Sequence, residues 1–181
     1  NFDGWFNDHN EKVTTITAGS IGNITLTARY SLINYNITYI LDGGHETANP
    51  RKYNILEEVT FKNAYKEGFN FIGWFDQPTD GLKVEKILPG TTGNIVLYAK
   101  YEIKSYQVLY YIDDEFYDEN TFVYGAEITI LDSPSKTGYI FSGWDLDEIP
   151  RYMPASDLFI DGFYEKINYS ITYHGLLEGE T

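Results

Sequence analysis

The side chains best suited to metal binding in this 181-residue sequence are three histidines and one dense acidic run. The histidines, His9, His45 and His174, fall at unrelated points of the chain, so their spacing predicts no zinc triad. His45 follows two glycines in a predicted turn, which is typical of an exposed loop histidine. The chain has no cysteine, which excludes disulfides and thiolate metal sites.

The acidic run spans Asp113 to Glu119 and contains five carboxylates. Hard cations favour clustered carboxylates, but the run lacks the D-x-[DN]-x-[DN]-G order of a calcium loop. The sequence therefore favours a solvated loop, and it leaves open whether the run binds calcium weakly.

Catalytic chemistry finds little support in the residue pattern. Glycoside hydrolysis needs two carboxylates at a fixed separation, and a chain with 27 acidic residues contains chance pairs in any case. The sequence has no nucleophile motif, phosphate-binding loop or metal signature. We predict that the protein is not an enzyme, nominate no catalytic, cofactor-binding or metal-ligating residue, and expect no cofactor.

Aromatic side chains are the remaining candidates, because exposed Trp and Tyr can stack on sugar rings. This makes a carbohydrate-binding module the alternative interpretation of the chain. Three Gly-Trp pairs contain Trp5, Trp74 and Trp144, spaced 69 and 70 residues apart inside apolar strands. Such regular recurrence favours a core role for these three indoles.

The tryptophans mark a repeat that covers nearly the whole chain. A Tyr-x-[Ile/Val]-x-Tyr pattern also recurs, each time five residues after a tyrosine that ends an alternating run. The three copies of the pattern are Tyr35–Tyr39, Tyr106–Tyr110 and Tyr169–Tyr173, and the preceding tyrosines are Tyr30, Tyr101 and Tyr164. The repeat predicts four segments: the C-terminal half of a unit (1–32), a full unit (33–103), a shortened full unit (104–167) and the opening strand of another (168–181).

Period-2 alternation predicts that each unit is mainly β, α+β at most. In the first full unit the expected strands are 35–41, 59–61, 69–75, 84–87 and 95–101, with a turn at 42–44 and at most a helical turn or two within 48–58. Gly68 and Gly138 precede the Gly-Trp strands, where we expect turns with positive φ. Ala28, Ala99 and Gly162 occupy matching positions of the closing strand, where a small residue leaves room for the Trp.

Charge and hydropathy restrict the partners and the location. A net charge of −14 disfavours nucleic acids and anionic membrane surfaces. No apolar run approaches the roughly 18 residues of a membrane span. The sequence shows no signal peptide and begins with Asn1, which suggests a piece of a longer chain.

The motifs Lys66-Glu-Gly-Phe-Asn-Phe-Ile-Gly-Trp-Phe75 and Gly93-Asn-Ile-Val-Leu-Tyr-Ala-Lys-Tyr101 resemble the Listeria-Bacteroides repeat, also called the internalin B-repeat. Residues 22–30 match the second motif as well, whereas the second full unit departs from the pattern after Trp144. The resemblance implies compact β-grasp-like units repeated along extracellular, cell-surface or cell-wall proteins of bacteria. It implies a stalk or adhesive role, with no shared enzymatic activity or cofactor.

Three further expectations concern packing. Tyr98 and Tyr111 fall opposite the inward set, and we expect them to pack against neighbouring repeats of the chain or against an unidentified protein or glycan partner. Only four residues separate Tyr101 from Tyr106, which predicts an elongated array. Residues 1–30 lack an opening strand, so the strand at 169–173 of one molecule is expected to add to the N-terminal half-unit of another.

Overall fold

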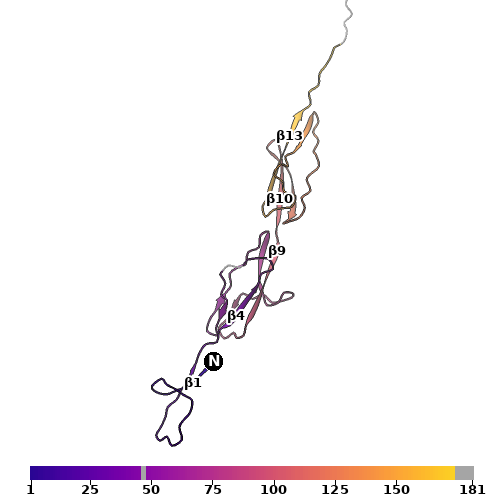
Figure 1. Cartoon of the computed structure of the whole chain (residues 1–181). Coiled ribbons are helices and arrows are strands. Elements are labelled where there is room, and N and C mark those ends of the chain that lie inside the picture. Colours follow the sequence, from indigo (N-terminus) through magenta and orange to yellow (C-terminus); the bar gives the residue numbers. More distant parts are fainter. Residues whose placement is uncertain (46–47, 174–181) are drawn as a thin grey trace, which may run out of the picture. The chain divides into compact units, whose positions relative to one another are not determined.

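The computed structural model describes residues 1–45 and 48–173 (Figure 1), and these residues form only strands and loops. The N-terminal strands are β1 (Phe2–Phe6), β2 (Lys12–Val13) and β3 (Thr27–Tyr30). The first repeat contains β4 (Tyr35–Ile40), β5 (Lys52–Tyr53), β6 (Val59–Thr60), β7 (Phe69–Phe75), β8 (Lys86–Ile87) and β9 (Ile95–Ile103). The second repeat contains β10 (Ser105–Ile112), β11 (Glu115–Val123), β12 (Tyr139–Trp144) and β13 (Leu158–Lys166).

The mainly β prediction is confirmed, and the stretch 48–58, where at most a helical turn or two was expected, contains no helix. That stretch contains β5, which pairs antiparallel with β4 through Tyr35 and Tyr53. Tyr53 is fully buried and its hydroxyl donates to the carbonyl of Gly93, so tertiary packing sets the backbone here. The chain divides into two compact units, residues 1–66 with 70–102, and residues 67–69 with the chain from Ile103 onward. The four-segment division at residues 32, 103 and 167 stays a prediction.

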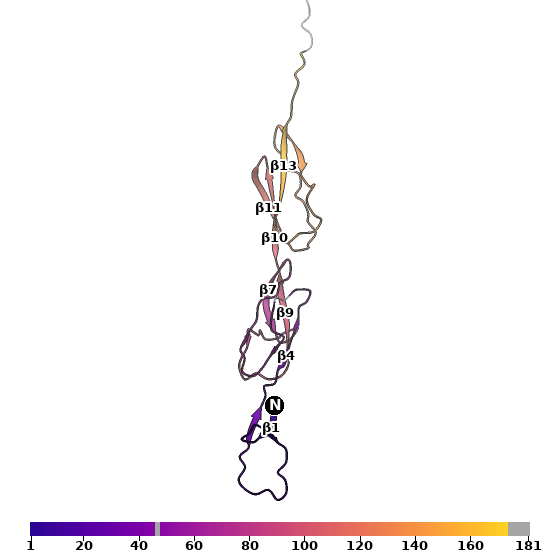
Figure 2. The ribbon, with the colours of Figure 1, turned by 60° about the vertical axis from the view of Figure 1, so that its left-hand side comes forward.

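Both repeats are built on the same four-stranded sheet, in the orders β5-β4-β9-β7 and β11-β10-β13-β12. In each, the opening strand lies parallel to the closing strand, as β10 and β13 do in Figure 2. Ile37 pairs with Ile95 in the first repeat, and Val108 pairs with Leu158 in the second. A parallel pair needs a long crossover, and β7 or β12 lies within it before the closing strand returns.

Each sheet buries one face. The core of the first repeat consists of Ile37, Tyr39, Tyr53, Val59, Ala64, Trp74, Ile87, Leu97 and Ala99. The core of the second consists of Val108, Tyr110, Met153 and Ile160, with further apolar side chains packed against it. The strands predicted at 59–61 and 84–87 correspond to β6 and β8, which pair as a two-stranded sheet in which Val59 faces Ile87. In the second repeat this sheet is reduced to one bridge, Glu127 to Tyr152.

The N-terminal segment corrects the prediction for Trp5. Its sheet has the order β2-β1-β3, and the Trp5 side chain is 48% exposed instead of buried. The alternating run from Ile24 forms a strand only from Thr27. The corresponding residues of β9, Ile95 to Tyr98, are the ones that pair with β4, so a closing run without its opening strand remains partly unpaired.

The opening strand predicted at 169–173 is not formed. These residues have no strand structure, because no closing strand of the described chain lies beside them. The rest of the predicted segment, including His174, lies outside the described residues.

The predicted turns are confirmed. Asp42 and Gly43 both have positive φ, and so do Asp113 and Asp114 in the second repeat. Two consecutive positive φ values at a two-residue connection define a type I′ turn, which suits a tight hairpin such as β10–β11. Gly68 and Gly138 have φ of 73° and 80°.

Candidate functional site

The centre of each repeat is the Gly-Trp pair, whose glycine makes a β-bulge. Phe71 and Trp74 are three residues apart, so strict alternation would place them on opposite faces of β7. Gly73, with φ of 152°, adds the extra residue that turns both rings to the core face. In the second repeat, the register of β12 against β13 shifts between Phe141 and Trp144.

The two tryptophans have matching contacts. The ring centroid of Trp74 lies 4.9 Å from Tyr39, and that of Trp144 lies 5.0 Å from Tyr110. Phe71 and Phe141 contact the same two indoles at 5.4 Å and 4.9 Å. All four contacts are edge-to-face, the arrangement that aromatic quadrupoles favour.

The N–H group of each indole also forms a hydrogen bond within its own repeat. Nε1 of Trp74 donates to the Lys62 carbonyl at 3.0 Å, and Nε1 of Trp144 donates to the Leu131 carbonyl at 2.9 Å. Trp74 is 3% exposed, whereas Trp144 is half-buried at the edge of its core. The predicted core role is confirmed for Trp74 and holds in part for Trp144. These indoles are therefore poor platforms for sugar stacking.

A small residue opposite the Trp is confirmed as a packing requirement. Trp144 pairs with Gly162 across β12 and β13. A Cβ on Gly162 would lie 2.7 Å from Phe141 Cζ and 2.9 Å from Trp144 Cε3, inside ordinary van der Waals contact. Ala99 is buried at the corresponding point of the first repeat.

The lysine at the first position of the Lys-x-Gly-aromatic motif contacts an aromatic ring in both repeats. Lys66 lies over the ring of Tyr101, 5.2 Å from its centroid, and forms an ion pair with Asp42 at 3.4 Å. Lys136 likewise lies 4.9 Å from the ring of Tyr164. In both repeats a lysine therefore binds the closing tyrosine by a cation–π contact.

Two tyrosines of the first repeat have a raised pKa. Burial, followed by the nearby Asp42 carboxylate, raises the pKa of Tyr101 above 10.0. Burial and the neighbouring Tyr35 raise the pKa of Tyr53 in the same direction. Both effects keep the phenols neutral, which suits a structural role better than acid–base chemistry.

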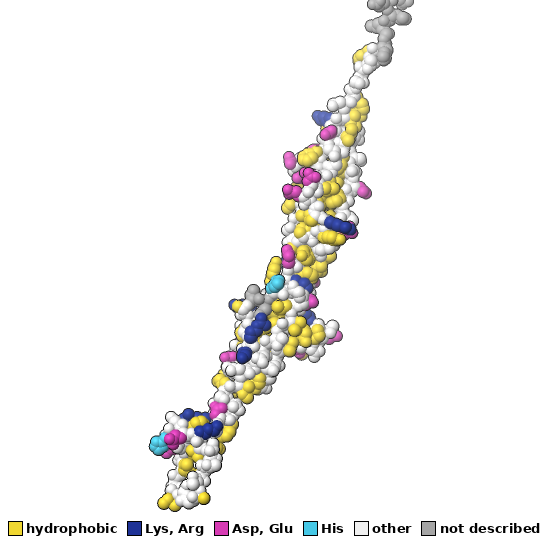
Figure 3. Space-filling view, in the orientation of Figure 1, with side chains coloured by type: hydrophobic (Ala, Val, Ile, Leu, Met, Phe, Trp, Pro, Cys, Tyr) yellow, Lys and Arg dark blue, Asp and Glu magenta, His cyan; other side chains and the backbone are white. Residues whose placement is uncertain are grey.

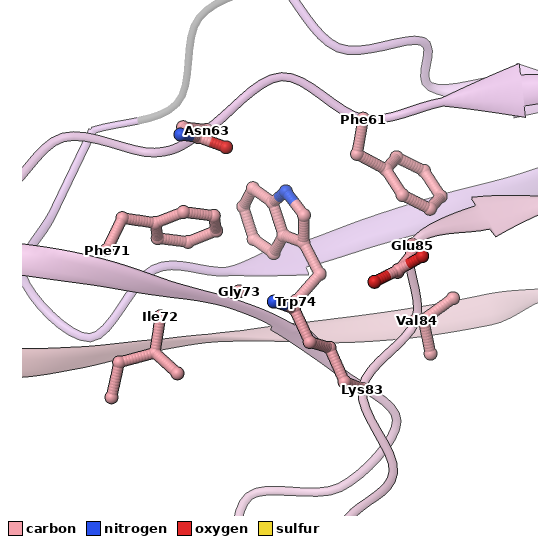
Figure 4. Close-up of a pocket in the computed structure, with 9 residues that line it drawn as sticks. All are labelled: Phe61, Asn63, Phe71, Ile72, Gly73, Trp74, Lys83, Val84 and Glu85. Atoms are coloured by element: carbon pink, nitrogen blue, oxygen red, sulfur yellow. The ribbon is translucent and has the colours of Figure 1, made fainter.

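A hollow of about 310 Å³ lies beside Trp74 (Figure 4). In the close-up, the indole lies between Phe61 and Phe71, while Ile72 points away from it. The Lys83 stem covers the bulge, since a Cβ on Gly73 would meet its Cε at 2.5 Å. The polar side chains of the hollow are Asn63, Lys83 and Glu85.

A second hollow, of about 510 Å³, lies on the outer face of the first repeat's sheet. It is lined by Ile40, Asp42, Ile72, Pro78, Tyr98, Ala99, Lys100 and Tyr101. Tyr98 therefore lies on the outer face, as the alternation predicts. The hollow combines apolar walls with a carboxylate and an ammonium group, which is the composition of a small binding site.

The outer face of the second repeat presents aromatic rings. Tyr111 lies 5.9 Å from Phe116 and 6.4 Å from Phe159, and the two phenylalanines are exposed. Figure 3 shows hydrophobic side chains, aromatic and aliphatic alike, as yellow surface among charged groups.

The acidic run forms a hairpin instead of a loop, and its residues are solvent-exposed as expected. Asp113 and Asp114 make the turn between β10 and β11, and the remaining carboxylates lie along β11. Oδ1 of Asp113 accepts from the amide of Tyr164 at 3.4 Å. Within residues 1–45 and 48–173, no three His, Cys, Asp or Glu side chains gather as a metal ion would require. The same part of the chain has no helix that could span a bilayer.

Residues 35–100 and 106–149 match the Listeria-Bacteroides repeat domain, which is more than half of the chain. The chain belongs to this repeat family. The predicted resemblance is thereby confirmed, and it places the chain in a family found in internalin-type surface proteins of bacteria.

The relatives of this Listeria-Bacteroides repeat chain are much longer proteins. Internalin H of Listeria monocytogenes is 29% identical over 111 residues, covering 61% of this chain and 20% of that protein. A putative membrane protein of Evansella cellulosilytica is 26% identical over 159 residues, covering 81% of this chain and 23% of that protein. The chain thus spans about a fifth of the length of these curated relatives.

Sequence reasoning missed three features of the repeat. The bulge at the Gly-Trp glycine was signalled by the odd spacing of Phe71 and Trp74. The lysine contact with the closing tyrosine leaves no periodic signal. The third feature is Asn49, a buried side chain whose amide exchanges two hydrogen bonds with the Lys62 backbone at 2.8 and 3.1 Å.

Proposed function

We propose that this chain is a non-catalytic structural segment of a bacterial cell-surface or secreted protein, serving as a spacer or as an adhesive array of repeats. The main support for this proposal is that the aromatic side chains of each repeated motif pack in the core of their own repeat. The aromatic rings stack on one another and the indole N–H groups bond to backbone carbonyls. Membership of the repeat family supports the same role and location.

A spacer requires repeats that cannot collapse onto one another. One residue, Lys104, separates β9 from β10, and four residues separate β3 from β4. Connections this short restrict relative motion far more than a flexible Gly/Ser linker would. We propose that the repeats form an elongated, semi-rigid array.

Small-angle scattering of the full chain tests the spacer role. A compact domain of this length has a radius of gyration of about 16 Å by the usual scaling. An elongated array should give a clearly larger radius and an asymmetric distance distribution. A radius of about 16 Å would refute the spacer proposal.

An adhesive role would depend on multiplicity, because several weak contacts on one chain bind far more tightly than a single contact. The unidentified partner would be a protein or a glycan, and the exposed rings of the second repeat's outer face are suited to either. A bead densely coated with the chain should then bind bacterial wall or host-cell surfaces more strongly than free chain.

A carbohydrate-binding module is the second candidate, favoured by the hollow at Tyr98. Its tyrosines, Asp42 and Lys100 offer a stacking surface with polar partners. If the hollow binds glycans, a glycan array should detect the full chain, and Tyr98→Ala should abolish the signal. Tyr65→Ala, at an exposed tyrosine outside the hollow, is the matched control. A pure spacer gives no glycan signal.

A further inference from the structure

A basic side chain covers an aromatic ring in both the N-terminal segment and the first repeat. Because side chains alternate along a strand, the residue after each Gly-Trp pair points to the face opposite the Trp. This residue is Phe6 in the N-terminal segment, where the Arg29 guanidinium carbon lies 4.5 Å from the ring centroid. It is Phe75 in the first repeat, where Nζ of Lys100 lies 4.3 Å from the centroid. In both places the cation comes from the residue before the closing tyrosine.

The second repeat has no cation at these two positions. Asp145 follows Trp144, and Phe163 precedes the closing Tyr164. Asp145 and Phe163 are both exposed. A carboxylate and an aromatic ring both attract a cation. The second repeat therefore presents two groups that attract a cation, without the basic residue found in the N-terminal segment and the first repeat.

The rest of this outer face is also aromatic and acidic. Its rings and carboxylates on β10, β11 and β13 include Tyr111, Phe116, Glu119, Phe159, Asp161 and Phe163. The Tyr111 ring contacts those of Phe116 and Phe159. Along β13, one residue separates Phe159 from Asp161 and Asp161 from Phe163, so these side chains follow one another at intervals of about 7 Å.

The basic residues of the second repeat contact other parts of it. The four described strands of its sheet contain one basic residue, Lys166, which ends β13 in the core-facing register with Tyr164. Lys136 lies over the ring of Tyr164, and Arg151 forms an ion pair with Glu127 at 3.1 Å. A cation over the outer face would therefore come from another molecule.

We propose that the outer face of the second repeat binds an extended, Lys/Arg-rich segment of a partner protein. This inference rests on the adhesive role proposed above and names the chemistry of the partner. In an extended segment every second side chain points the same way, at the spacing of Phe159, Asp161 and Phe163. Basic residues at alternate positions of the segment therefore meet a ring, a carboxylate and a second ring in turn.

One edge of this face is hollowed. The hollow has a volume of about 350 Å³ and is lined by Phe159, Ile149 and four carboxylates, Asp145, Asp147, Glu148 and Asp161. The apolar stem of a bound Lys lies along Phe159 and Ile149, and its ammonium group reaches the carboxylates. The hollow thus receives one basic side chain of the segment.

Other occupants fit the face less well. A second copy of this chain has the same net charge of −14 and is repelled, as are nucleic acids and anionic membranes. A neutral glycan stacks on the rings, but it removes water from the carboxylates without supplying a counter-charge. A basic protein segment satisfies both the rings and the carboxylates.

Isothermal titration calorimetry of the full chain with a short peptide of alternating Lys and Thr tests the proposal. The peptide should bind, more weakly as salt rises to about 0.15 M, whereas a peptide of alternating Glu and Thr should not bind. Phe163→Lys places a cation where Lys100 lies in the first repeat, and it should weaken binding about tenfold. Tyr65→Lys adds the same charge at an exposed position of the first repeat and should leave binding unchanged.

A second pair of variants changes one charge without changing size. Asp161→Asn should weaken binding about threefold, because it removes one exposed ion pair. Asp8→Asn makes the same change at an exposed carboxylate of the N-terminal segment and should have no effect. Binding that Phe163→Lys leaves intact, or that Tyr65→Lys weakens equally, overturns the proposal. Self-association of the chain that Phe163→Lys abolishes also overturns it, because the face would then belong to a second copy.

The peptide titration and the binding of coated beads to cell surfaces distinguish this inference from the adhesive role. If the beads bind and the peptide does not, the adhesive role stands and the basic partner is wrong. If neither binds, both are wrong. Binding of the peptide with the expected order of variants supports the basic partner.

Discussion

The N-terminal segment and the first repeat share a Gly-Trp strand and a closing run, yet only the repeat buries its tryptophan. Trp5 is half-exposed next to a shortened β3, while Trp74 is enclosed beneath β4 and β9. The missing element is the parallel opening strand with its stacked tyrosine. The comparison shows that the Gly-Trp motif places the indole on the core face and the opening strand encloses it.

The second repeat lies between these extremes. It has its opening strand, and Trp144 makes the same aromatic contacts as Trp74, but the indole is only half-buried. The segment after Trp144 is shorter than in the first repeat, and the β6–β8 pair is reduced to a single bridge. Enclosure of the Trp therefore also depends on the crossover segment.

The largest expected effect is the difference between Trp74→Ala and Trp5→Ala. Removing the enclosed Trp74 should lower the free energy of unfolding by about 3 to 5 kcal/mol, the usual cost for a core aromatic. Trp5→Ala should change it by about 0.5 kcal/mol at most, as at other surface positions. Chemical denaturation followed by circular dichroism measures both values. Equal losses would contradict the comparison.

A second expected effect distinguishes the closing strands of the two repeats. Gly162→Ala should lower the free energy of unfolding of the second repeat by about 1 to 3 kcal/mol, because the new methyl overlaps Phe141 and Trp144. Ala99→Gly, at the matching position, removes a methyl and should cost about 1 kcal/mol. Thermal denaturation of both variants checks the order. If Gly162→Ala left the free energy of unfolding unchanged, the rings of Phe141 and Trp144 would have moved to make room for the methyl group.

A smaller effect separates the turn at residues 42–43, after β4, from the hairpin turn at residues 113–114, between β10 and β11. The first turn has Gly43 at its second position, whereas the second has Asp114 with φ of 67°. Asp114→Gly should stabilise the second repeat by about 0.5 kcal/mol, by relieving strain and repulsion from the adjacent acidic residues. Denaturation midpoints measure the change. Destabilisation would show that the Asp114 side chain makes a contact worth more than the strain.

The smallest effect appears only at alkaline pH. Burial raises the pKa of Tyr101 above 10.0 in the folded chain, so the folded state holds this proton more tightly than the unfolded state. The associated stability is complete below pH 10 and is lost as pH rises through the folded pKa. Tyr101→Phe should therefore flatten the decline in stability above pH 10. An unchanged decline would assign it to other phenols, such as Tyr53.

The features that could be predicted from the sequence are those that recur at regular spacing along the chain. Repeating Tyr and Trp positions identified the strands, the turns at Gly68 and Gly138, and the small residue opposite Trp144. The sequence prediction was wrong for residues 24–26 and 169–173, which have the alternating pattern of a strand but no strand structure. A strand forms only beside a partner strand, and an alternating pattern does not show whether that partner is present. Side-chain hydrogen bonds such as those of Asn49 and ring contacts such as that of Lys66 depend on three-dimensional packing and left no signal.

Hydrogen exchange by mass spectrometry most directly tests the claim that the opening strand closes each repeat. In a dilute sample, amides of residues 95–98 and 158–162 should exchange slowly, since they pair with β4 and β10. Residues 24–26 should exchange rapidly despite their matching sequence. Protection of 24–26 equal to that of 95–98 would contradict the account, because closing strands would then form without their opening strands.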